Sequence, residues 1–148
     1  MKSTEAGSLL QDWLDSAEPE LSLVIDGGEV VVQRAAGTLL CKAALSVGWR
    51  GQSGLLEKAL RLSAPSLGLF GERSAALSMN PADGRFWLLL RAGGDGYASL
   101  EALLEANLDS LVNQRDSWNE LLKREAPKRM PFAQPLPVRP FRQGGAYA

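Results

Sequence analysis

Residues 21–34 read LSLVIDGGEVVVQR, and this stretch decides the fold. Two runs of aliphatic and β-branched residues flank Gly27 and Gly28, and a glycine pair can supply the two positive-φ positions that a tight hairpin needs. The stretch therefore predicts two antiparallel strands that meet at a Gly27–Gly28 turn. After a break at Gly37, residues 38–47 predict a third strand, which extends the hairpin into an antiparallel meander.

Both faces of this meander carry apolar side chains. Leu21, Leu23 and Ile25 alternate onto one face, Val24 points to the other, and residues 30–32 are three consecutive valines. A sheet with one face in water needs only one apolar face. The surplus therefore predicts that a helix or a partner protein covers each face.

Working outward, the hydrophobic periodicity predicts helices over residues 3–17, 55–62 and 97–124. The middle helix is expected to break at Pro65 because proline lacks the backbone N–H. Residues 72–80 and 85–91 predict two further strands around a Pro81–Gly84 turn. The expected fold is α+β in the order α-β-β-β-α-β-β-α, an antiparallel sheet with flanking helices.

Composition separates a body from a tail. Residues 1–125 are expected to form one α+β domain, and residues 126–148, which hold five of the eight prolines, a basic, Pro-rich flexible tail. Residues 1–124 carry 12 basic and 16 acidic side chains, which argues against nucleic-acid binding. One cysteine, no signal peptide and no long apolar run predict a cytoplasmic protein without membrane insertion.

Catalytic chemistry has little support in these residues. The sequence contains no histidine, and Cys41 sits in an apolar strand pattern that favours a packed core thiol over a nucleophile. The Gly93-Gly-Asp-Gly96 segment lacks the spacing of a phosphate-binding loop and fits a strand-to-helix turn better. We therefore expect no enzyme activity, no cofactor and no metal site.

The element order resembles that of the class I chaperones of bacterial type III secretion, the Tir-chaperone-like (CesT-like) family. The runs at 88–91, 100–105 and 117–122 look like the last strand and helix of that family, and the likeness covers about residues 5–124. It implies a bacterial, cytoplasmic homodimer that binds the N-terminal segments of secreted effectors and keeps them export-competent. It leaves open whether the tail contacts the export ATPase, an effector or nothing.

The resemblance also implies two sets of site residues. The dimer interface would comprise Leu55, Leu56, Ala59, Leu60, Trp87 and Leu89. The effector-binding surface would comprise Trp13, Leu23, Ile25, Val30 and Val32, although each of these residues also fits a place in the core. A dimeric protein-binding adaptor, or an export-control protein without a dedicated effector, is the alternative function. A small-molecule-binding domain or cryptic enzyme is a third.

Overall fold

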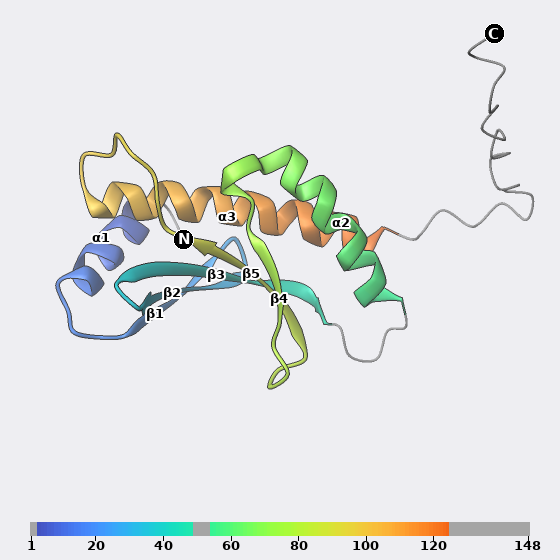
Figure 1. The fold of residues 1–148 in the computed structure, drawn as a ribbon. Helices are drawn as coiled ribbons and strands as arrows, with labels where there is room; N and C mark the ends of the chain where they lie inside the picture. Colours follow the sequence, from blue (N-terminus) through green and yellow to red (C-terminus); the bar gives the residue numbers. More distant parts are fainter. Residues whose placement is uncertain (1–2, 49–53, 125–148) are drawn as a thin grey trace, which may run out of the picture.

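The computed structural model describes residues 3–48 and 54–124, and the predicted tail at 126–148 lies outside the described residues. The described chain is α+β, and its elements follow the predicted order (Figure 1). The elements are α1 (Ser3–Leu14), β1 (Glu20–Ile25), β2 (Gly28–Ala35), β3 (Thr38–Gly48), α2 (Leu55–Phe70), the 3₁₀ turn η1 (Gly71–Arg73), β4 (Ala76–Met79), β5 (Arg85–Arg91) and α3 (Leu100–Lys123).

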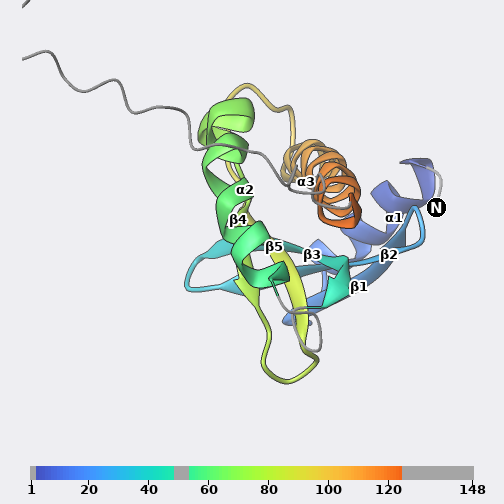
Figure 2. The same ribbon diagram turned by 90° about the vertical axis from the view of Figure 1, so that its right-hand side faces the viewer.

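The five strands form one antiparallel sheet in the order β1-β2-β3-β5-β4. The first three strands are the predicted meander, and β5 pairs with β3 so that β4 lies at the second edge. Helices α1 and α3 lie across one face of the sheet, while α2 lies on the side of β4 (Figure 2). Among residues 3–48 and 54–124, helices cover one face of the sheet, and no helix covers the other, which we call the open face.

The hydrophobic core lies between the sheet and α3. Val30 and Val32 of β2 point into it with 0% exposure, and α3 contributes a stripe at three- and four-residue spacing. Cys41 is also buried there, which confirms the predicted core thiol, and burial raises the pKa of the Cys41 thiol to about 12. The stripe of α3 consists of Leu104, Leu108, Leu111, Val112, Trp118 and Leu122.

Three buried polar residues, Asn107, Gln114 and Arg115, interrupt this stripe, and the last two fix how α3 docks. The amide of Gln114 is fully buried, donates to the carbonyl of Arg73 at 2.7 Å and accepts from the backbone N–H of Ala75 at 2.8 Å. Arg115 is 2% exposed and donates to the carbonyl of Ile25 at 2.9 Å. A Cβ at Gly28 would lie 2.4 Å from Nη1 of Arg115, so the glycine permits this close approach.

Several sequence-based boundaries were wrong, and two of them concern the first hairpin turn and the end of α2. The first hairpin turns at Asp26 and Gly27, which have φ of 48° and 75°, while Gly28 already pairs with Ile25. Aspartate is one of the few non-glycine residues that adopt this conformation readily. Helix α2 continues through Pro65 to Phe70. Pro65 is exposed, so water can reach the carbonyl of Arg61 that loses its helical hydrogen bond.

The other segments occur in the predicted order with some ends shifted: α1 ends at Leu14 rather than at residue 17, and α3 begins at Leu100 rather than at residue 97. β5 has the predicted bounds, whereas the segment predicted as a strand at 72–80 is a 3₁₀ turn followed by the shorter β4. Gly94 and Gly96 have φ of 131° and 84°, which confirms that the glycine-rich segment before α3 is a strand-to-helix turn. Within the described ranges, none of the helices has the length and apolar character that a membrane-spanning segment needs.

Candidate protein-binding surfaces

Helix α2 has a buried side and an apolar side that faces solvent. Leu55, Ala59 and Ser66 are buried at helical spacing, as expected for the side that faces the rest of the domain. Leu56, Leu60 and Leu67 follow at i, i+4 and i+11, which places them together on another side of the helix. They are 39%, 61% and 63% exposed, and we call these three residues the leucine ridge.

Polar contacts hold α2 at both ends, so the leucine ridge has a fixed position. Nζ of Lys58 donates to the carbonyl of Leu122 at 3.2 Å and to that of Arg124, which ties the start of α2 to the end of α3. The hydroxyls of Ser66 and Ser74 lie 3.2 Å apart near the other end. Isolated leucines on a surface are ordinary, but three aligned on one anchored helix are typical of an interface.

The open face of the sheet carries a second apolar cluster. Val31 alternates away from Val30 and Val32, so its side chain points to the face opposite the core. There it packs with Ala44 and Trp87, and these three residues are 5%, 5% and 9% exposed. Leu89 packs against the cluster, whereas Val24 on the same face is 60% exposed. We call Val31, Ala44, Trp87 and Leu89 the open-face cluster.

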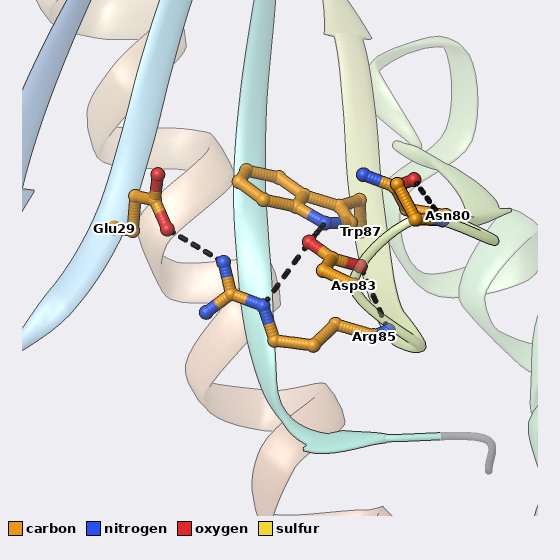
Figure 3. A network of polar contacts seen from close by, with 6 residues as sticks. Glu29, Asn80, Asp83, Arg85 and Trp87 are labelled. Atoms are coloured by element: carbon orange, nitrogen blue, oxygen red, sulfur yellow. Dashed lines mark hydrogen bonds and ion pairs between the residues drawn. The ribbon is translucent and has the colours of Figure 1, made fainter.

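The indole of Trp87 is fixed by a polar network that Figure 3 shows from close by. Nε1 of Trp87 donates to Oδ2 of Asp83 at 3.0 Å. The guanidinium of Arg85 lies 5.0 Å from the centroid of the Trp87 ring and donates to Glu29 at 2.6 Å and to Asp83 at 3.3 Å. The ring is therefore held from the β4–β5 turn on one side and from β2 on the other.

This network shifts two pKa values. Partial burial raises the pKa of the Asp83 carboxyl, but hydrogen bonds from the Arg85 backbone, the Trp87 indole and the Arg85 side chain outweigh it, so the pKa lies below its ordinary value. The hydrogen bond to Glu29 raises the pKa of Arg85, and the bond to Asp83 adds to it. Both groups are charged near neutral pH, and the open-face cluster is bordered by charge.

The predicted interface residues divide into three groups. Leu56 and Leu60 lie on the leucine ridge, while Leu55 and Ala59 face the interior of their own chain. Trp87 and Leu89 belong to the open-face cluster. Leu67 was missing from the predicted set because the helix was expected to end before it.

The predicted effector-binding residues lie mainly in the core. Trp13, Leu23, Val30 and Val32 are between 0% and 5% exposed, and Ile25 is half-buried beside them. This is the core role that the sequence left open for each of them. The four buried side chains could contact a bound segment only if the helices above them moved.

The edge of the sheet offers a further surface. β1 lies at one end of the strand order and, within residues 3–48 and 54–124, pairs only with β2. An unpaired edge presents backbone N–H and C=O groups to which an extended segment can add. Among the described residues, no group of three or more His, Cys, Asp or Glu side chains could hold a metal ion.

This arrangement of helices and sheet is the fold of type III secretion chaperones, as expected from the resemblance. A chain of the heterodimeric ExoU–SpcU complex from the type III secretion system of Pseudomonas aeruginosa matches with a TM-score of 0.51 and 24% identity, over 79% of this chain and 97% of that one. A chain of the ExsC–ExsE complex matches with a TM-score of 0.56 and 19% identity, over 81% and 95%.

A chain of the HopA1–SchA chaperone–effector complex matches with a TM-score of 0.52 and 13% identity, over 81% of this chain and 98% of that chain. The sequence matches no protein-family model and no curated protein. At sequence identities of 13–24%, these structural matches show a common fold.

Proposed function

We propose that this protein is a type III secretion chaperone that binds the N-terminal segment of an effector and keeps it export-competent. The observation that carries the proposal is the fold, since the described part of the chain superposes over most of its length on a chain from a type III secretion complex and on a chain from a chaperone–effector complex. The leucine ridge and the open-face cluster supply apolar surface for protein partners.

A homodimer is the first assembly in this proposal. The leucine ridge is the surface that a second copy would cover, because an obligate interface resembles a core and excludes exposed charge. Leu56 and Leu60 would contact the partner copy directly, and Leu55 and Ala59 would hold α2 in place from within. Trp87 and Leu89 remain proposed interface residues on the open face.

An extended effector segment would bind elsewhere on the same dimer. The free edge of β1 can accept a strand, and Val24, which is 60% exposed, lies beside that edge on the open face. Backbone hydrogen bonds would give affinity, and apolar side chains of the segment would pack against the sheet. Ile25, half-buried at the end of β1, is the predicted effector-binding residue with the most accessible side chain.

The proposed activity is binding without covalent chemistry, in the cytoplasm of a bacterium. The sequence has no histidine, and its only cysteine is buried with a pKa raised to about 12, so neither a histidine base nor a reactive thiolate is available near neutral pH. A protein of this kind holds its partner unfolded and then releases it to the export apparatus. No cofactor has a part in that cycle.

The test is capture from a bacterium that carries this gene, with identification of the captured proteins by mass spectrometry. The proposal expects a secreted protein that is lost from the capture when its own N-terminal segment is deleted, while the rest of that protein is unchanged. Capture of a cytoplasmic regulator that is never secreted would favour the adaptor or export-control function. Capture that survives deletion of the N-terminal segment would contradict the proposal.

A further inference from the structure

The open-face cluster surrounds a positive charge. The two sequence neighbours of Lys42 are both 0% exposed in the core, so alternation along β3 points the Lys42 side chain to the open face. Its cross-strand partners are Val31 of β2 and Leu89 of β5. Nζ of Lys42 lies 6.0 Å from the centroid of the Trp87 ring. A cation therefore lies in the middle of the apolar side chains that this face presents.

No carboxylate of the described chain neutralises Lys42. Its side chain is half-buried and, among residues 3–48 and 54–124, forms no ion pair. The carboxylates that border the cluster, Glu29 and Asp83, are both bonded to Arg85. Glu20 points to the same face, but it lies on β1, two strands or about 10 Å away from β3.

Arg91 adds a second positive charge to the open face. Leu90 is 6% exposed and Ala92 packs against the core, so the Arg91 side chain between them points to the other face. Arg91 pairs with Leu40 across β3, which makes it a diagonal neighbour of Lys42. It is exposed and has no ion-pair partner in the described part of the chain. The body of the protein nevertheless carries more acidic than basic side chains.

A partner that covers the open-face cluster must accommodate the charge of Lys42. Contact with Val31, Trp87 and Leu89 would take the ammonium group out of water, and a buried charge without a counter-ion is costly. A carboxylate on the partner offsets this cost, because it pairs with the ammonium group in apolar surroundings. The charge therefore determines which partner fits this face.

Two occupants from this protein itself fit poorly. A second copy, for which Trp87 and Leu89 were predicted, would bring its own Lys42 and Arg91 into a twofold contact here, while its bordering carboxylates are bonded to Arg85. Residues 125–148 hold four basic residues and one acidic residue, so the tail would add positive charge. An acidic segment of another protein is the complementary occupant.

We infer that the open-face cluster binds an extended segment of the secreted partner in which an Asp or Glu lies between two apolar residues, and that this carboxylate pairs with Lys42. The inference rests on the proposed function, because it gives the bound segment a place and a sequence pattern. Alternate side chains of an extended segment point the same way, so the pattern is apolar-x-acid-x-apolar. Arg91 strengthens the preference for acidic segments, and the leucine ridge is the surface left for a second copy.

A titration of the full-length, ¹⁵N-labelled protein tests this surface. The probe is the peptide acetyl-Gly-Leu-Ser-Glu-Ser-Leu-Gly-amide, with versions in which Gln or Lys replaces the Glu. We expect saturable shifts of the Val31 and Lys42 amide signals and of the Trp87 indole signal. Binding should be about fivefold weaker for the Gln version, the size of one partly exposed ion pair, and weaker again for the Lys version.

Two variants of Lys42 sharpen the test. Lys42→Glu should reverse the order of the Glu and Lys peptides, whereas Arg61→Glu, an equal charge change at an exposed position of α2, should keep it. Lys42→Gln should reduce the preference for the Glu peptide over the Gln peptide without a new charge in the sheet. The comparison of peptides on the wild-type protein decides the matter even if a variant does not fold.

Equal affinity of the wild type for the three peptides, shifts that spare the open face, or no saturable shifts would each overturn the inference. A dimer mass that falls to 15.9 kDa in Leu89→Glu would assign the face to a second copy and would overturn it as well.

The outcome is separable from that of the proposed function. If an effector is captured through its N-terminal segment and Lys42→Glu leaves its affinity unchanged, the inference fails and the chaperone proposal stands. If no secreted protein is captured, the chaperone proposal fails, and the titration still decides whether the open face binds acidic, apolar segments.

Discussion

Replacement of Leu60 by Glu on the leucine ridge should convert the proposed dimer to a monomer. Leu60 keeps 61% of its side chain exposed in the single chain, and full burial of a leucine stabilises by about 1.5–3 kcal/mol. Burial of the remaining surface is therefore worth about 1–2 kcal/mol per copy. A twofold interface contains the residue twice, so the loss is about 2–4 kcal/mol, or roughly 30- to 1,000-fold in the dissociation constant.

The introduced carboxylate would raise this loss further, because an unpaired charge in an apolar interface is costly. Light scattering coupled to size exclusion, repeated over a dilution series, measures the effect as a shift from near twice 15.9 kDa toward 15.9 kDa. Leu69→Glu is the matched control. Leu69 is 75% exposed on the same helix, and it lies nine residues, or two and a half turns, after Leu60, on the opposite side.

A dimer that tolerates Leu60→Glu as well as it tolerates Leu69→Glu would refute the reasoning. The interface would then have to lie on another surface, and the open-face cluster with Trp87 and Leu89 would be the next one to test. If the wild-type protein is itself a monomer, the proposal of a homodimer is wrong.

Four further predictions concern the core, the polar network and the tail. Gln114→Ala should lower the free energy of unfolding in urea by about 1–3 kcal/mol, because the N–H of Ala75 is left unpaired, whereas Asn113→Ala on the exposed side should not. The Cys41 thiol should react with Ellman's reagent only upon unfolding, so fast labelling of the native protein would contradict its burial. The pKa of Asp83 is lowered in the folded protein, so its contribution to the free energy of unfolding is complete above the unfolded pKa of about 3.9 and is lost as the pH falls through the folded pKa. In this acidic range, tryptophan fluorescence should change in the wild type but not in Asp83→Asn. Deletion of residues 126–148 should leave folding and dimerisation intact, and loss of either would show that the tail is structural.

The element order and the β5 bounds could be read from the sequence because both depend on local signals. Alternation, turn residues and a long apolar stripe each act over a few residues. The extent of α2 could not be read in this way, because Pro65 is tolerated where solvent and the neighbouring Ser74 support the helix. The turn at Asp26 and Gly27 was displaced by one residue because Asp and Gly both suit positive φ.

The surfaces were harder to predict than the elements. Alternation shows that Leu23, Val30 and Val32 share a face, but it does not say whether α1 and α3 cover that face or the other. Gln114 and Arg115 were missed as buried residues, although their positions within the apolar stripe of α3 carried a signal. A cleft between the β2–β3 turn, the end of β5 and the start of α3 depends on the meeting of three distant segments, and no local pattern reports that.

The central claim is that a dimer of this chain holds one unfolded segment of a secreted protein. Native mass spectrometry of the protein purified together with its captured partner tests it most directly. We predict two copies of the chain with one copy of the partner, and release of that partner when its N-terminal segment is removed. A complex with a single copy of the chain, or a partner bound only through a folded domain, would contradict the account.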